Sequence, residues 1–355
     1  MLLLTPGPVP VPDFIQQALM RPVIPHRGKI FEGIYSQLLE RLQYLFQTTH
    51  PVCTMIGSGT LGVEAAMYSL LRPGEPVLVV NIGKFSERWA DYARVLGLDT
   101  HEVRKSWGQT ITPAELQAAA EAIPGLRGVV ITHCETSTGV AVDLEEISYA
   151  LRQVCPEVLI IVDAITTAGA IPLYADAWDL DCVVTASQKA LMNPAGLVCF
   201  GVSPRGQEAL RETHAADYRN LLNYLRQAAK GSYPYTPPVQ LLYGVDEALA
   251  YIGRETLPVI WNRTHTAARF FRAGLETLGG KLFPESPSDS LTAFSLPGHN
   301  PDVVRKYMSE VHQVILSGGQ GHLTSQIARV SHMGMADITA MKTALTALEA
   351  ALQQN

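Results

Sequence analysis

The sequence predicts an α/β fold in which helices cover both faces of a mostly parallel sheet. Between residues 51 and 200, short apolar runs alternate with amphipathic helical stretches. The runs are apolar at successive positions, which is typical of strands buried on both faces. The composition agrees with a large core, because 47% of the residues are hydrophobic and 17% are charged.

Strands and helices are expected in alternation along this part of the chain. The apolar runs predict strands at residues 51–56, 76–80, 127–133, 158–163, 182–186 and 196–200. The stretches between them predict helices at residues 61–71, 84–97 and 143–154. Ligands bind at the carboxyl ends of the strands in such sheets, so the residues that follow each strand are the first candidates for a site.

The chain is expected to divide into three parts, since 355 residues suit one large domain and a smaller one. Residues 1–13 are rich in proline and predict an extended arm outside the sheet. Residues 14–255 form the predicted large domain, and residues 256–355 the predicted small α+β domain. The small domain is expected to contain helices at 257–279, 301–311 and the C-terminus, and strands at 290–296, 313–318 and 327–333.

The charge and the apolar pattern disfavour several classes of protein. The chain has 27 basic and 33 acidic residues, and a net charge of −6 disfavours non-specific binding to nucleic acid. No apolar run approaches the roughly 18 residues of a membrane helix, and the N-terminus lacks the basic segment of a signal peptide. We therefore expect a cytoplasmic protein that binds neither nucleic acid nor a membrane.

The cysteines show no pattern of a metal site. They are odd in number and mostly lie in apolar runs, and none forms a CxxC pair. They are Cys53, Cys134, Cys155, Cys182 and Cys199. Reduced thiols are therefore expected, with neither a disulfide framework nor a bound metal.

A glycine-rich turn follows the first expected strand. In "MIGSGTLGVEAA", the residues Gly57, Ser58, Gly59 and Thr60 separate this strand from a helix. Free backbone N–H groups and the helix dipole favour an anion at such a turn, which makes phosphate a candidate ligand. An ordinary tight turn explains the same residues, and the Walker and dinucleotide motifs are absent.

Three more polar features follow later strands. Asp163 ends the apolar run "VLIIVD", where a carboxylate needs a partner, although a helix cap or a salt bridge would also satisfy it. Ser137 lies in the polar loop "ETSTG", which by itself is only a turn. Lys189 stands between two apolar runs, and it is either an edge residue or an amine whose pKa burial lowers.

Together these features point to pyridoxal 5′-phosphate (PLP). The glycine-rich turn matches the phosphate, the carboxylate matches the pyridine nitrogen, and the lysine amine matches the aldehyde. Each feature has an ordinary structural explanation alone, but the combination is typical of a PLP site.

The chain resembles the class V aminotransferases of PLP fold type I, in particular the alanine–glyoxylate and serine–pyruvate branch. The resemblance covers nearly the whole chain. It rests on "LLLTPGPVPVP", "GSGTLGVEAA", "NIGKFSERW", "ETSTGV", "VDAITTAG", "SQKAL", "YPYTPPV" and "SQIARVSHMG", in this order. It implies a mostly parallel seven-stranded sheet with helices on both faces, a small C-terminal α+β domain, and a homodimer with shared active sites.

The resemblance also implies a role for each matching residue. Lys189 would form the Schiff base with PLP, the internal aldimine, and Asp163 would pair with the ring nitrogen, so both would be catalytic. Arg329 would bind the substrate α-carboxylate. The other cofactor contacts would be Ser58, Gly59, Thr60 and Gln188 at the phosphate, Phe85 and Ile165 on the two ring faces, Ser137 through a hydrogen bond, and Tyr233 and Thr236 across the dimer interface.

The expected reaction is a transamination between a small amino acid, alanine or serine, and a 2-oxo acid, glyoxylate or pyruvate. Arg329 reads only the α-carboxylate. Arg27 is a candidate for binding a side-chain carboxylate, although a surface or interface charge also explains it. An aspartate-type activity is therefore a second expectation. Ser331 stands where the family usually has glycine, and this departure weakens any transfer of substrate identity.

Two other functions remain open. A PLP lyase or desulfurase shares the fold, but a desulfurase needs a cysteine on a mobile loop, and neither Cys53 nor Cys199 is placed in one. A non-catalytic PLP-binding subunit of a redox complex is the other, because some relatives carry the label of a soluble hydrogenase subunit. Nothing in the sequence resembles an iron–sulfur or nickel site, and Asp163, Lys189 and Arg329 are all present.

Overall fold

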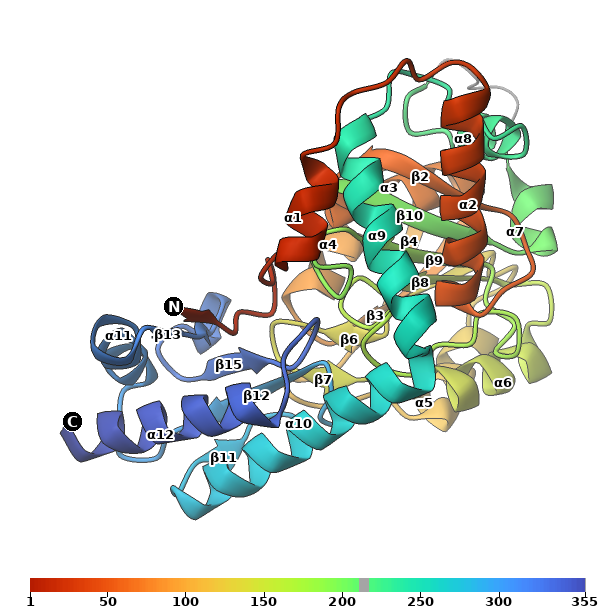
Figure 1. Ribbon diagram of the computed structural model, residues 1–355. Coiled ribbons are helices and arrows are strands. Elements are labelled where there is room, and N and C mark those ends of the chain that lie inside the picture. Colours follow the sequence, from red (N-terminus) through yellow and green to blue (C-terminus); the bar gives the residue numbers. More distant parts are fainter. Residues whose placement is uncertain (211–216, 355) are drawn as a thin grey trace.

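A seven-stranded sheet forms the centre of the computed structural model, which describes residues 1–210 and 217–354 (Figure 1). The strand order is β2-β10-β9-β8-β5-β3-β4. The strands are β2 (Val52–Gly57), β3 (Pro76–Asn81), β4 (Asp99–Arg104), β5 (Gly128–Thr132), β8 (Leu159–Asp163), β9 (Cys182–Ala186) and β10 (Gly196–Val202). Neighbours from β9 to β4 are parallel, whereas β10 runs antiparallel to both β2 and β9.

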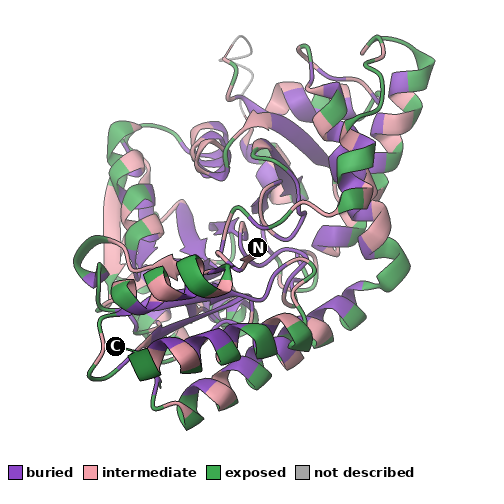
Figure 2. Ribbon diagram, turned by 60° about the vertical axis from the view of Figure 1, so that its left-hand side comes forward, coloured by how far each residue is buried: buried purple, intermediate pink, exposed green. Residues whose placement is uncertain are grey.

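Helices pack on both faces of this sheet. They are α1 (Asp13–Leu19), α2 (Lys29–Phe46), α3 (Gly59–Leu70), α4 (Lys84–Val95), α5 (Pro113–Glu121), α6 (Leu144–Val154), α7 (Pro204–Ala209), α8 (Leu221–Ala228) and α9 (Val239–Glu255). Strands β5, β8 and β9 are buried at every residue, while the helices carry both buried and exposed residues (Figure 2). This pattern explains why the central strands read as continuous apolar runs.

Helix α3 lies unusually close to the sheet. A Cβ atom at Gly62 would lie 2.3 Å from Val198 Cγ1 and 2.7 Å from Val184 Cγ1. Only glycine fits this contact without displacing a strand. The N-terminus of α3 is therefore held directly at the end of β2.

Strand β4 was not expected from the sequence. It lies at the edge of the sheet and pairs only with β3, and all six of its residues keep some exposure. Its sequence "DTHEVR" is accordingly mostly polar and lacks an apolar run. The other six strands were expected; β9 matches its predicted ends, and no end of the others differs by more than two residues.

A second group of elements surrounds its own apolar core. Its four-stranded sheet has the order β11-β12-β15-β14, and Phe271, Phe294, Met308, Val330 and Leu348 are among its buried residues. Its elements are α10 (Leu257–Thr277), β11 (Lys281–Leu282), β12 (Leu291–Ser295), α11 (Pro301–His312), β13 (Val314–Ile315), β14 (Ser317–Gly318), a 3-10 turn (Gly321–Leu323), β15 (Ala328–Ser331) and α12 (Ile338–Gln354). The expected strand at 313–318 is thus two short strands.

The N-terminal arm lies outside the large sheet but is not free of pairing. Its strand β1 (Leu2–Leu3) pairs in parallel with β13, and Leu4 O accepts a hydrogen bond from Ser331 N at 2.8 Å. Farther along, Val9 N donates to Gln188 O at 3.1 Å. The arm therefore connects the small sheet to the end of β9. A short hairpin of β6 (Cys134–Glu135) and β7 (Val140–Ala141) completes the strands of the described chain.

Within residues 1–210 and 217–354, every helix is too short or too polar to cross a membrane. The same residues contain no cluster of three or more His, Cys, Asp or Glu side chains that could hold a metal ion.

Candidate active site

A small cavity of about 110 Å³ opens where β2, β8 and β9 end. Eight of the predicted site residues line it together with two that were not predicted. The predicted ones are Ser58, Gly59, Thr60, Phe85, Asp163, Ile165, Gln188 and Lys189, and the others are Trp89 and Thr136. Residues far apart in sequence thus meet at the carboxyl ends of these strands, where ligands bind in such sheets.

The N-terminus of α3 forms one wall of this cavity. Ser58 is the N-cap, but its side chain makes no capping hydrogen bond, so it does not satisfy the N–H groups of the first turn. A Cβ at Gly59 would lie 2.5 Å from Ile165 Cδ1, so a larger residue would close the space. This wall offers N–H donors and a positive helix end to an anion.

Asp163 is buried at the end of β8. Its Oδ1 accepts a hydrogen bond from Ile165 N at 3.0 Å. Burial raises the pKa of this carboxyl to about 7, and that hydrogen bond and the Lys189 amine oppose the shift. A cationic or N–H partner in the cavity would hold the carboxylate in its charged form.

The Lys189 amine lies under the N-terminal arm. Its Nζ donates to the main-chain oxygen of Pro6 at 2.5 Å. Desolvation lowers the pKa of this amine to about 8, and the nearby Asp163 carboxylate opposes the shift while Arg329 adds to it. An amine with this pKa is partly neutral near pH 7 to 8, as a nucleophile or a base requires.

Trp89 is a site residue that the sequence reasoning missed. It lies one turn after Phe85 on α4, lines the cavity and is almost fully buried. Its Nε1 donates to Thr132 Oγ1 at 3.1 Å. The spacing of four residues from Phe85 on one helix could have indicated it, because such residues share a face.

Ser137 does not line the cavity of its own chain, so the role predicted for it stays a prediction. Its side chain is fully buried away from the cavity, and its Oγ donates to Glu135 Oε1 at 2.5 Å. Lys84 N in turn donates to the same Oγ at 3.0 Å. The preceding residue, Thr136, lines the cavity instead. The hydroxyl of Ser137 therefore helps to hold the start of α4.

Glu135 anchors the segment that carries Phe85. The backbone N–H groups of Phe85 and Ser86 donate to its carboxylate at 3.2 and 3.0 Å. The side chain is fully buried, and Ser137 N and Oγ supply further donors. A carboxylate at this helix N-terminus is stabilised by the helix dipole as well as by these hydrogen bonds.

Arg329 lies beside the cavity without lining it. It is buried on β15, where Nη1 donates to Thr136 O at 2.7 Å and Nε donates to Gly318 O at 2.9 Å. Burial lowers the pKa of this guanidinium to about 10, and the Glu135 carboxylate opposes the shift. The two carbonyls fix the orientation of the guanidinium plane next to Thr136.

Tyr233 and Thr236 do not reach the cavity of their own chain. Tyr233 is buried within its own subunit, where its ring centre lies 5.6 Å from that of Tyr35. Thr236 is exposed and lines a different hollow together with His26. Of these two residues, only Thr236 has an exposed side chain.

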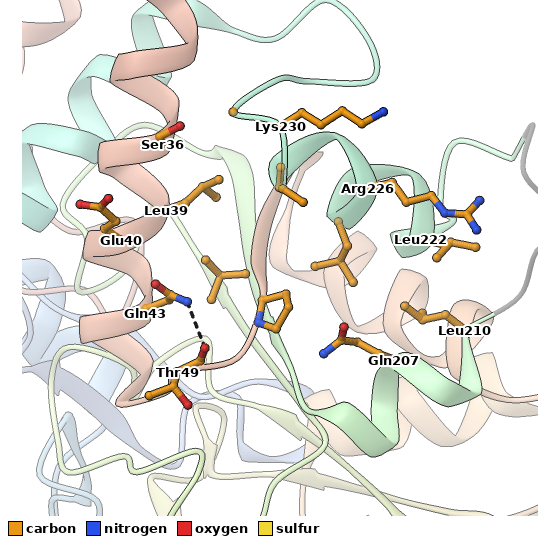
Figure 3. A pocket seen from close by; sticks show the side chains of 16 residues that line it. Ser36, Leu39, Glu40, Gln43, Thr49, Gln207, Leu210, Leu222, Arg226 and Lys230 are labelled. Atoms are coloured by element: carbon orange, nitrogen blue, oxygen red, sulfur yellow. Dashed lines mark hydrogen bonds between the residues drawn. The ribbon is translucent and has the colours of Figure 1, made fainter.

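A hollow much larger than this cavity lies elsewhere. It has a volume of about 780 Å³ and lies between α2 and α8 (Figure 3). Leu39, Leu222 and Leu225 provide apolar surface, while Glu40 and Arg226 lie at its sides. It contains none of the predicted site residues, so size does not identify the active site here.

Comparison with known proteins identifies the family. The model of the family "Aminotransferase class-V" matches residues 17–344. This chain belongs to the class-V aminotransferases. Membership confirms the expected fold type I and makes the protein a PLP-dependent aminotransferase, which acts on amino and keto acids.

Relatives of this class-V aminotransferase carry different names. A "Soluble hydrogenase 42 kDa subunit" from Anabaena cylindrica is 35% identical over 99% of this chain and 93% of its own length. An "L-aspartate--glyoxylate aminotransferase" from Paracoccus denitrificans is 32% identical over 96% of this chain and 89% of its own. A "Serine--glyoxylate aminotransferase" from Methylorubrum extorquens is 30% identical over 99% and 91%.

Solved structures agree closely with this fold. An aspartate aminotransferase from Thermus thermophilus has a TM-score of 0.93 at 30% identity, over 100% of this chain and 99% of that one. An alanine–glyoxylate aminotransferase from Nostoc sp. has the same TM-score and identity, over 99% and 95%. A cysteine desulfurase from Thermococcus onnurineus, at 14% identity and a TM-score of 0.79, shares the fold alone.

The residues of the cavity fit PLP. The Gln188 amide lines the cavity, and its buried Oε1 has no hydrogen-bond partner among the described residues. The N–H groups of this amide can donate to a phosphate, and the absence of a Cβ at Gly59 keeps the space beside Ile165 open. Lys189 offers an amine, and Asp163 a carboxylate, in the same cavity lining. These are the donor and acceptor types that a phosphorylated pyridine aldehyde requires.

Proposed function

We propose that this aminotransferase moves the amino group of a small neutral amino acid, alanine or serine, to glyoxylate or pyruvate, with Lys189 as the catalytic amine. The observation that carries the proposal is the placement of Lys189. Its Nζ lies in a desolvated cavity with the Asp163 carboxylate near enough to affect its pKa, and the guanidinium of Arg329 lies close by.

Each residue has a task that follows from its position. PLP, when bound, supplies the electron sink that makes the α-proton of the amino acid acidic. Ser58, Gly59, Thr60 and Gln188 hold its phosphate, and Asp163 pairs with the ring nitrogen. Phe85 and Ile165 enclose the ring. We assign the contact expected of Ser137 to Thr136, because Thr136 lines the cavity.

Lys189 carries the proton in this proposal. Its amine is held at the cavity by Pro6 O, and its lowered pKa leaves a usable fraction neutral. The neutral amine accepts the proton from the α-carbon of the amino donor. In the second half-reaction the same amine returns a proton to the α-carbon of the new amino acid. Arg329 binds the α-carboxylate and so fixes which bond of the substrate faces Lys189.

The preference for a small neutral substrate rests on the charges around the cavity. Lys189 is the only cationic side chain among the residues that line it in the described chain. Arg329 is engaged by two carbonyls and suits one carboxylate. A second carboxylate on the substrate would therefore lack a dedicated partner from the same subunit.

An aspartate-type activity is the second candidate. It is favoured by two relatives that are each at least 30% identical, the L-aspartate–glyoxylate aminotransferase and the aspartate aminotransferase structure. Arg27 is exposed and does not line the cavity of its own chain, so it could act only on a neighbouring subunit. We propose a homodimer in which the Tyr233–Thr236 segment completes the neighbouring site.

A screen of donors and acceptors tests this proposal. The PLP-loaded enzyme should lose its long-wavelength absorption band with alanine or serine and regain it with glyoxylate or pyruvate. Lys189→Ala should abolish turnover. A preference for aspartate would support the second candidate, and a yellow protein that never cycles would support a binding subunit of a redox complex. A clean, active monomer in solution would contradict the shared site.

A further inference from the structure

Arg88 connects two elements of the cofactor site from outside the cavity. It lies on the exposed face of α4, and its Nη1 donates to Thr60 Oγ1 at 2.9 Å. Its guanidinium carbon lies 5.5 Å from the centre of the Phe85 ring. Thr60 and Phe85 both line the cavity, whereas Arg88 does not. One exposed side chain thus contacts both the phosphate wall and the ring wall.

We infer that Arg88 positions and polarises the Thr60 hydroxyl for the phosphate of PLP. This inference rests on the proposed function, which places the phosphate at the N-terminus of α3. A threonine hydroxyl has one proton to donate. Because the Arg88 guanidinium occupies a lone pair of Oγ1, that proton is free to point toward an acceptor in the cavity. An N–H donor with a positive charge also strengthens the O–H as a donor.

The charge requirement supports the same role. A phosphate ester is close to doubly negative at neutral pH, while Ser58, Gly59, Thr60 and Gln188 are all neutral. Lys189, the one cation of the described cavity lining, is committed to the aldehyde in the proposed function. Arg88 is the charged side chain bonded directly to a residue of the phosphate wall.

Neighbouring charges leave Arg88 available for this role. Glu64 lies one turn after Thr60 on α3, and burial raises the pKa of its carboxyl. The guanidiniums of Arg219 and, less strongly, Arg88 oppose this rise. Glu64 therefore has Arg219 as a second cationic neighbour, and it does not neutralise the charge of Arg88 by itself.

The test compares PLP with pyridoxal, which has the same ring and aldehyde but no phosphate. Dissociation constants of both are measured on the apoenzyme by absorbance for the wild type and Arg88→Gln. We expect Arg88→Gln to raise the Kd of PLP about tenfold, the size typical of a lost charge-assisted hydrogen bond, and to change the Kd of pyridoxal less than twofold. Arg88→Lys should recover part of the loss.

A double-mutant cycle with Thr60→Val shows whether Arg88 acts through this hydroxyl. In the Thr60→Val background, Arg88→Gln should change the Kd of PLP less than twofold. Arg94→Gln, which removes a cation from the far end of the same helix, is the control and should leave the ratio of the two Kd values unchanged.

Three results would overturn the inference. They are an unchanged Kd of PLP in Arg88→Gln, equal losses for PLP and pyridoxal, or a full loss that persists without the Thr60 hydroxyl. The proposed function fails separately, if the wild-type protein forms no absorbing adduct with PLP that depends on Lys189.

Discussion

The amine of Lys189 and the main-chain oxygen of Pro6 are joined by a hydrogen bond of 2.5 Å, although 183 residues separate them in the chain. The N-terminal arm thereby contacts the lysine that lines the cavity. Gly7 follows Pro6 with φ +128°, and a Cβ there would lie 2.2 Å from Lys189 Nζ. A side chain at residue 7 would therefore have to displace the end of the Lys189 side chain.

Gly7→Ala should therefore block Lys189. We expect the rate of PLP adduct formation to fall at least about tenfold, because the new Cβ displaces the amine from its acceptor. Gly28→Ala is the matched control, since Gly28 has φ +124° and nothing within 4 Å of its would-be Cβ. Both variants bear backbone strain of about 1–3 kcal/mol, but only the first should lose PLP capture. Equal rates in both variants would contradict the fit.

The capture of PLP should depend on pH through Lys189. Only the neutral amine attacks an aldehyde, and its pKa is lowered from 10.5 to about 8. The rate of adduct formation by the apoenzyme should thus rise with pH through a midpoint near 8 and be lost below it, as measured by stopped-flow absorbance. Lys189→Ala, which lacks the amine, gives the background absorbance change. A midpoint near 10.5 would mean that the amine is not desolvated in solution.

Arg329→Lys should weaken substrate binding more than cofactor binding. Lysine cannot keep both carbonyl contacts to Thr136 and Gly318 while offering a two-pronged donor to a carboxylate. We expect the KM for alanine to rise on the order of 10- to 100-fold, with little change in the Kd of PLP. Arg272→Lys, at an ion pair with Asp289, serves as the control. A KM that stays within threefold of wild type would rule out this role.

Glu135→Gln should destabilise the protein by about 2–4 kcal/mol. The amide keeps one acceptor oxygen but turns an NH₂ group toward N–H donors of Phe85 and Ser86. Urea unfolding of the apoenzyme measures the loss. The half-exposed Glu87 on α4 is the control, and Glu87→Gln should cost less than about 0.5 kcal/mol. Similar costs for the two variants would show that the buried carboxylate does not hold the start of α4.

Thr136→Ala and Ser137→Ala should separate ligand binding from stability. Thr136 lines the cavity, so its loss should raise the Kd of PLP or the KM for alanine about three- to tenfold. The Ser137 hydroxyl donates a hydrogen bond to Glu135, so Ser137→Ala should lower the free energy of unfolding by about 1–2 kcal/mol. The Kd of PLP and the KM for alanine should stay within twofold of the wild-type values. The reverse pattern would restore the role first expected of Ser137.

The buried strands were predictable because their chemistry is local. A strand covered on both faces needs successive apolar residues, so β5, β8 and β9 could be located from the chain alone. Asp163 and Lys189 could likewise be predicted to lie close together, because each follows a strand and parallel strands have their carboxyl ends on the same side of the sheet. The edge strand β4 was not predicted, since its residues are partly exposed and do not form an apolar run.

The sequence by itself determined the family, the central strands and the main chemical groups of the site. Only the tertiary structure decided which side chain faces the cavity. Thr136 and Ser137 are neighbours with similar hydroxyls, and the direction of each depends on backbone angles set by Glu135 and α4. The contact of Pro6 with Lys189 likewise follows from how the arm packs, because hydrogen bonds between distant segments leave no local pattern in the residues that form them.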